Sequence, residues 1–163
     1  MTRQSTDLAD TLAHKRINRL LVSPRIRAQE TAKFIADEAG LDISTLDSFR
    51  ERNGYGVLTG MTKTEAKAKY PEQVEALKDI HYGVDGAEEY QLIQARIINA
   101  LDQASRDNAA GVTAIVTHGG PIRLIYRDIL KLGEIDVDDC AYTVITRDGE
   151  TYKLLEHYGI TLK

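Results

Sequence analysis

Two short apolar runs, each leading directly into the start of a helix, constrain the fold most strongly. Residues 17–23 stop at Pro24, and residues 112–117 lead into Gly119-Gly120-Pro121. Short apolar runs of this kind are typical of strands that are covered on both faces in a parallel sheet. The sequence therefore predicts two buried parallel strands, far apart in the chain, each followed at once by a helix.

Helical and strand-like segments alternate through the rest of the chain. Amphipathic spacing predicts helices over 2–14, 24–39, 88–105 and 121–133, with two short helices around Pro71. Residues 43–49 read as a strand, 54–60 as a glycine-rich loop, and 142–146 with 151–157 as a β-hairpin. This order favours an α/β protein with three layers (α/β/α), whose mostly parallel sheet has an antiparallel C-terminal edge.

Size and charge limit the classes of partner. A chain of 163 residues, 42% of them hydrophobic, fits one domain over 1–163. The net charge of -4 provides no field that would attract nucleic acid or an anionic membrane, so local arginines must hold any anionic substrate. A polar N-terminus and the single cysteine, Cys140, make the cytoplasm the expected location.

The carboxyl ends of the two apolar runs are where a ligand is expected, because open α/β sheets bind ligands there. Arg27 lies in the first turn of the helix after the first run, and its side chain can tilt back toward the strand end. His118 and Gly119 follow the second run. Alone, Arg27 reads as a solvated helix residue and His118 equally well as a core histidine. Together they predict a guanidinium and an imidazole that converge on one phosphoryl group.

Two segments carry a specific resemblance. Ser23-Pro24, Arg27-Ala28 and Thr31-Ala32 resemble the Ser-Pro-x-x-Arg-Ala-x-x-Thr-Ala segment of the histidine phosphatases, the phosphoglycerate mutase-like superfamily. Residues 117–123, Thr-His-Gly-Gly-Pro-Ile-Arg, are similar to the second-histidine motif of that family.

Two further segments follow in the family's order. Residues 51–60 resemble the Glu-Arg-x-Tyr-Gly-x-Leu-x-Gly loop of the mutases, with one extra residue after Arg52. Glu88 with Arg96 resembles the family's Gly-Glu-Ser helix start, although the residues beside Glu88 differ. The resemblance implies a phosphoglycerate mutase-like fold.

The resemblance also implies a mechanism that needs no metal and no cofactor. In the family a histidine attacks the phosphorus of a phosphomonoester. Arg27 and His118 would hold the equatorial oxygens, with Ser23 and Gly119 as further substrate-binding residues. Glu51 would be the general acid that protonates the leaving alkoxide, and the substrate would be a small phosphorylated metabolite.

One part of the family pattern is not found. The family's nucleophile stands in an Arg-His-Gly triplet at the end of a strand before the helix expected over 2–14, and none of His14, His81 and His157 stands in such a triplet. The interpretation is an N-terminally incomplete domain that lacks the first strand and is inactive by itself. Without that strand, residues 20–22 are predicted to form an unpaired apolar edge, which favours self-association. The oligomeric state is otherwise open.

Three functions remain as alternatives. The first is a phosphomonoester hydrolase, and the second is a non-catalytic phosphate-binding or interaction pseudoenzyme. The third is a phosphoglycerate mutase-like isomerase, which the short stretch between Glu51 and Glu88 disfavours because the family's mutase insertion needs more room. A nucleotide-binding loop at residues 60–64 is rejected, since its spacing is not that of a Walker loop.

Overall fold

The computed structural model describes residues 8, 11–12, 14–81 and 83–163. The helix expected over 2–14 falls largely outside the described residues. The chain forms two compact units: unit 1 comprises Met1–Glu51 and Ile97–Lys163, and unit 2 comprises Arg52–Arg96. The expectation of a single domain stays a prediction, and each unit is described by itself.

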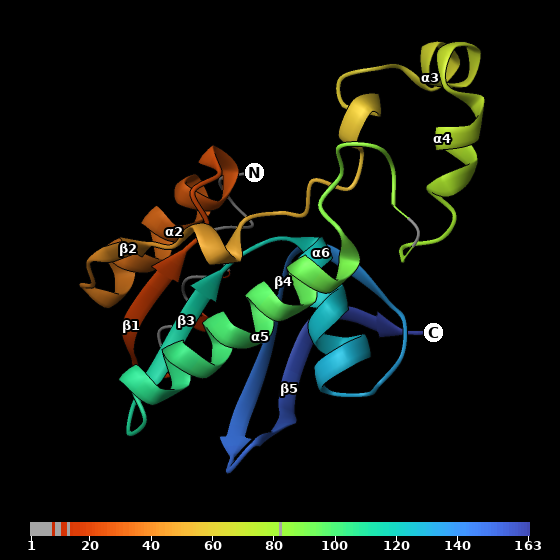
Figure 1. Ribbon diagram of the computed structural model, residues 1–163. Coiled ribbons are helices and arrows are strands. Elements are labelled where there is room, and N and C mark those ends of the chain that lie inside the picture. The colour runs from red at the N-terminus through yellow and green to blue at the C-terminus, as the bar shows by residue number, and fades with distance from the viewer. Residues whose placement is uncertain (1–7, 9–10, 13, 82) are drawn as a thin grey trace. The chain divides into compact units, whose positions relative to one another are not determined.

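Unit 1 contains a three-stranded parallel sheet (Figure 1). Its strands are β1 (Ile17–Val22), β2 (Ile43–Thr45) and β3 (Val112–Val116), in the order β2-β1-β3. Both strands predicted from the apolar runs are present, side by side, with Val22 opposite Val116. The carboxyl ends of β1 and β3 therefore meet at one edge of the sheet.

The predicted unpaired edge at residues 20–22 is wrong. These residues pair with Ile43–Thr45 of β2 on one side and with residues 114–116 of β3 on the other. The prediction failed because it gave β1 a free side, whereas the stretch after Leu41 returns to pair there. Self-association through this edge therefore has no structural support.

Helix α2 (Ile26–Ala39) covers one face of β1. Its buried residues, Ala28, Ala32, Ile35 and Ala36, pack against Leu20 and Val22. Leu21 points to the opposite face and is also buried, so β1 is covered on both sides. The helix ends, as expected, at Gly40, whose φ of 64° is the left-handed conformation that glycine favours.

The two strands of the C-terminal hairpin in unit 1 are longer than the sequence predicted. Strands β4 (Ile135–Asp148) and β5 (Thr151–Leu162) form the antiparallel hairpin. Its core contains Tyr126 from the helix that follows β3. That helix starts as α6 (Gly119–Leu124) and continues as a π-helix, Ile125–Ile129.

Unit 2 holds the loop after Glu51 and two short helices. These are α3 (Lys63–Lys69) and α4 (Pro71–Ala76), as predicted around Pro71. Helix α5 (Tyr90–Asp107) begins in unit 2 and continues in unit 1. None of the described helices has the length and apolar character needed to cross a bilayer.

Candidate active site

Ser23 and His118 meet where β1 and β3 end. Ser23 follows the last residue of β1 and is fully buried, and its backbone N–H donates to the carbonyl oxygen of Val116 at 2.9 Å. His118 has an extended backbone at the start of α6 and is 6% exposed. Ser23 Oγ lies 2.7 Å from His118 Nε2. The parallel register of the two strands thus joins residues 95 positions apart.

Arg27 reaches the same histidine from the first turn of α2. Its Nε donates a hydrogen bond to His118 Nδ1 at 3.2 Å. The helix starts at Ile26, not at Pro24 as predicted, because Arg25 has an extended backbone with φ -73° and ψ 135°. The predicted convergence of Arg27 and His118 is confirmed, whereas their roles toward a substrate stay predictions.

Glu51 lies against the backbone that follows His118. The amide of Gly120 donates to Glu51 Oε2 at 3.4 Å. A Cβ atom on Gly120 would stand 2.2 Å from Glu51 Oε1, so only glycine permits this approach. Nearby, Thr117 Oγ1 donates to the carbonyl oxygen of Phe49 at 2.8 Å, which ties the segment before Glu51 to the end of β3.

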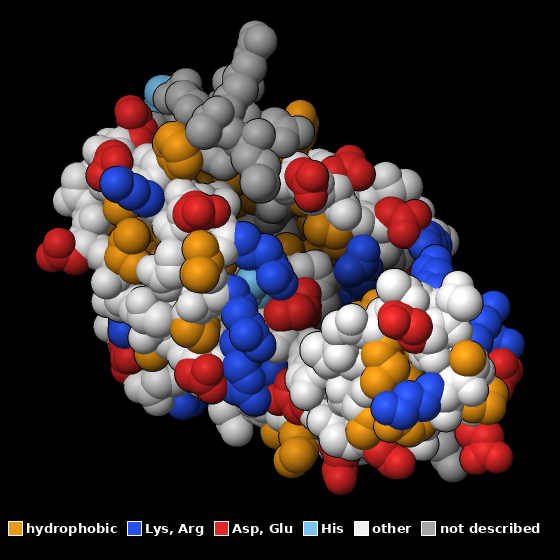
Figure 2. All heavy atoms as spheres, turned by 90° about the horizontal axis from the view of Figure 1, so that it is seen from above, with side chains coloured by type: hydrophobic (Ala, Val, Ile, Leu, Met, Phe, Trp, Pro, Cys, Tyr) orange, Lys and Arg blue, Asp and Glu red, His pale blue; other side chains and the backbone are white. Residues whose placement is uncertain are grey.

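Burial and charge both act on the imidazole. Burial lowers the pKa of His118 below 6.5, and the positive charges of Arg27 and then Arg25 lower it further. The carboxylate of Glu51 acts in the opposite direction and raises this pKa. Figure 2 shows Lys and Arg side chains gathered beside a histidine and an acidic side chain. His118 is therefore mainly uncharged at neutral pH, with cationic groups around it.

Two further arginines, Arg25 and Arg123, belong to this region, and neither was among the site residues predicted from the sequence. Arg25 is close enough to His118 to affect its pKa. Arg123 folds back over the start of α6: its Nη1 lies 2.8 Å from the position that a Cβ on Gly119 would take. Among the described residues neither guanidinium has a hydrogen-bond or ion-pair partner. Their positions in the two motifs could have indicated a place at the site: Arg25 comes two residues before Arg27, and Arg123 comes five residues after His118.

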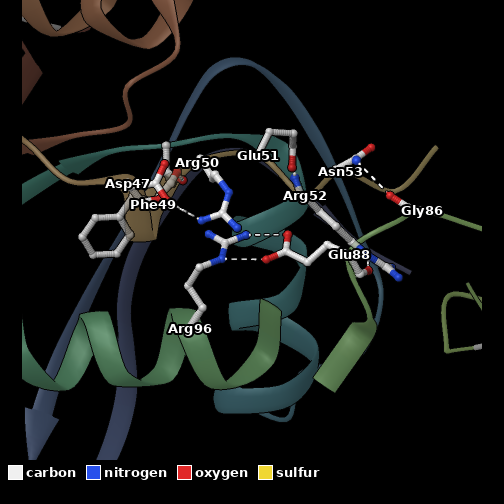
Figure 3. A network of polar contacts seen from close by, with 11 residues as sticks. Asp47, Phe49, Arg50, Glu51, Arg52, Asn53, Gly86, Glu88 and Arg96 are labelled. Atoms are coloured by element: carbon white, nitrogen blue, oxygen red, sulfur yellow. Dashed lines mark hydrogen bonds and ion pairs between the residues drawn. The ribbon is translucent and has the colours of Figure 1, made fainter. Parts of the chain in front are cut away.

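Part of the polar network drawn in Figure 3 lies in unit 2. Glu88 and Arg96 form a double hydrogen bond, with Nε to Oε1 at 2.9 Å and Nη2 to Oε2 at 2.8 Å. Arg52 Nε donates to the carbonyl oxygen of Glu88 at 3.1 Å, and its guanidinium lies over the ring of Tyr90. The Glu88–Arg96 pair, expected from the sequence only as a motif match, holds the start of α5 to the preceding loop.

Metal ligands do not cluster in the part of the chain that the structure describes, where no group of three His, Cys, Asp or Glu side chains could hold an ion. The site's donors are instead nitrogen atoms of arginine and histidine, which suit an anion.

A family model of the histidine phosphatase superfamily (branch 1) matches residues 2–159. The chain belongs to the histidine phosphatase superfamily. It is 31% identical to phosphoglycerate mutase-like protein 4 of Arabidopsis thaliana over 129 residues, a match that covers 76% of this chain and 56% of that protein. The chain thus spans little more than half the length of this curated relative.

Solved structures share the fold. YhfR of Bacillus stearothermophilus superposes with a TM-score of 0.82 at 21% identity, over 93% of this chain and 78% of that one. A mycobacterial glucosyl-3-phosphoglycerate phosphatase in complex with VO3 gives a TM-score of 0.74 at 22% identity, over 93% and 81%. At these identities the likeness establishes the phosphoglycerate mutase-like fold of this chain.

Proposed function

We propose that this chain binds the phosphoryl group of a small phosphorylated metabolite, and that the reaction served by its site is hydrolysis of a phosphomonoester. The observation that carries the proposal is the contact between Arg27 and His118 at the joined ends of β1 and β3. A structural relative with this fold is a phosphatase complexed with VO3, which supports an anion at such a site.

The residue roles follow from the chemistry of phosphoryl transfer, which depends on positioning and on stabilising charge at the phosphoryl oxygens. Arg27 and His118 are proposed to hold these oxygens, with Ser23 and the backbone at Gly119 beside them. In the family the phosphoryl group passes to a nucleophilic histidine, from which water releases it as phosphate. Toward such a reaction, Glu51 is proposed to give its proton to the leaving alkoxide oxygen.

No nucleophilic histidine is identified in this sequence, and this limits the activity that we propose for it. None of its four histidines stands in an Arg-His-Gly triplet. We therefore propose that the chain of 163 residues binds phosphate without turnover, as a non-catalytic phosphate-binding protein would. The purified chain is expected to release no phosphate from p-nitrophenyl phosphate. Turnover that disappears in His118→Ala would contradict this part of the proposal.

Binding of inorganic phosphate or vanadate, measured by calorimetry, tests the site itself. Arg27→Ala removes a charged donor worth about 1.5–3 kcal/mol, so binding should weaken roughly 10- to 100-fold. Arg106→Ala is the matched control, because Arg106 is an exposed arginine in the last turn of α5. Equal affinities of the two variants would exclude Arg27 as a phosphate ligand.

A mutase activity has one observation in its favour, the 31% identity to a phosphoglycerate mutase-like protein. Hydrolysis is preferred because the segment between Glu51 and Glu88 is short. An assay that follows isomerisation of a phosphoglycerate alongside phosphate release distinguishes the two activities.

A further inference from the structure

The hydrogen bonds of His118 determine which ring nitrogen carries the proton. Arg27 Nε can only donate, so His118 Nδ1, 3.2 Å away, must present a lone pair. A neutral imidazole has one N–H group, which must then be at Nε2. That N–H points to Ser23 Oγ at 2.7 Å, and Ser23 is the acceptor. The two contacts together point to the neutral Nε2–H tautomer.

Protonation of His118 is incompatible with this arrangement. A proton on Nδ1 would face the N–H of Arg27, which places two donors and two positive charges against each other. Three charged groups act electrostatically on the ring. Arg27 and Arg25 come from the start of α2, and Glu51 comes from the segment that follows Phe49. Burial of the ring contributes most to the preference for the neutral form, and the two cations outweigh the one carboxylate.

Ser23 fixes the orientation of the ring. It is fully buried, and its Oγ also accepts the backbone N–H of Arg25 at 3.3 Å. With that bond and the Nε2–H bond in place, the ring cannot turn without losing an acceptor for its buried N–H. Nδ1 is consequently the nitrogen presented toward Arg27 and toward any anion that Arg27 binds.

An anion that arrives at Nδ1 meets a lone pair and is repelled. If Nδ1 takes up a proton, it becomes a donor to the anion, and Arg27 is released to donate to another anion oxygen. We propose that anion binding at this site is coupled to uptake of one proton by His118 Nδ1, with Ser23 as the positioning residue that makes Nδ1 the acceptor. This inference rests on the proposed phosphate site and adds a control by pH that the proposal itself does not contain.

The tautomer can be measured without any ligand. In the 15N-labelled chain at pH 7.5, two-bond 15N–1H correlations should show His118 as neutral Nε2–H. The signal is assigned by its loss in His118→Gln or, should that variant not fold, by its persistence when His14, His81 and His157 are all replaced by glutamine. A neutral Nδ1–H form or an imidazolium would overturn the proposal.

Ser23→Ala tests the positioning role. Loss of the acceptor should convert the single tautomer into a mixture, whereas Ser44→Ala, an exposed serine on β2, should leave it unchanged. A purely structural role of Ser23 would lower stability without changing the tautomer, and that result would remove Ser23 from the proposal.

Sulfate is the probe for the coupling, because it carries no proton near neutral pH. Calorimetry in two buffers of different ionisation enthalpy should show uptake of about one proton per sulfate, with affinity falling about tenfold per pH unit above the pKa of His118. Binding without proton uptake would overturn the coupling. Absence of any sulfate or phosphate binding would instead refute the proposed phosphate site, and the tautomer measurement would still stand.

Discussion

At the scale of residues, the decisive contacts join groups that lie in separate motifs of the sequence. Glu51, Gly120 and His118 form one such set, in which the carboxylate sits on the glycine amide and acts on the imidazole. The absence of a side chain at Gly120 is what permits this approach. The pKa of His118 therefore depends on Gly120, a residue that has no side chain.

Glu51→Gln tests this dependence. The carboxylate of Glu51 raises the pKa of His118, so removing its charge should lower that pKa further. Gly120→Ala should act in the same direction, because the added methyl group displaces the carboxylate. The measurement is an NMR titration of His118, with Glu150→Gln in the hairpin turn as the control. An unchanged or raised pKa in Glu51→Gln would show that the carboxylate does not face the ring.

The sequence was sufficient for the meeting of Arg27 and His118, because the ends of adjacent parallel strands and the tilt of helical side chains are general rules. It was not sufficient for the roles of Ser23 or Arg123. Ser23 accepts from a ring nitrogen 95 positions away, and no local pattern encodes that contact. The position of Arg123 over Gly119 depends on its side-chain conformation, which no sequence pattern encodes.

At the scale of elements, the predictions were good where a segment determines its own conformation. They were poorer where pairing with another strand sets the ends of the element. Helix α2 ends at Gly40 as expected from glycine alone. The stretch 43–49 pairs only over Ile43–Thr45 and then turns into a 3-10 helix, Asp47–Phe49. Strand β4 begins seven residues before the predicted 142, at Ile135, because β5 supplies the opposite strand. Pairing of this kind is not visible in either segment alone.

Helix α3 offers an element-level test. Thr62 Oγ1 accepts from the backbone N–H of Glu65 at 3.3 Å, and Glu65 Oε2 accepts from the backbone N–H of Thr62 at 2.8 Å, a capping box. Thr62→Ala should destabilise this helix by about 0.5–2 kcal/mol. Amide hydrogen exchange across residues 63–69 measures the effect. The control is Thr64→Ala, which removes an exposed hydroxyl from the same helix.

In that comparison, equal exchange rates in the two variants would mean that the capping box contributes nothing to α3. Faster exchange confined to Thr62→Ala is the expected outcome. Because the substitution acts on unit 2, phosphate binding at His118 gives an independent check that unit 1 is intact.

At the scale of the whole molecule, the free energy of unfolding should depend on pH through His118. Its pKa lies below 6.5 in the folded chain and near 6.5 in the unfolded chain. Between these values the unfolded state binds more protons, so stability falls as the pH is lowered through this window and levels off below the folded pKa. The slope is at most about 1.4 kcal/mol per pH unit for one proton.

Urea unfolding at a series of pH values checks this. His118→Gln should have a flatter profile than the original chain between pH 7 and pH 5, while His157→Gln, at an exposed position of β5, should follow the original profile. An identical slope in all three proteins would assign the acid sensitivity to other groups.

The register of β1 against β3 also has a kinetic consequence. The imidazole of His118 reaches its acceptor, Ser23, only when Val22 lies opposite Val116. A slip of one residue would turn these side chains to the opposite face of the sheet. Closure of so long a loop is entropically costly, so we expect it to come late in folding. The ability to bind an anion should therefore appear in the same folding step as the pairing of β1 with β3. Anion binding during refolding would then report when this pairing forms.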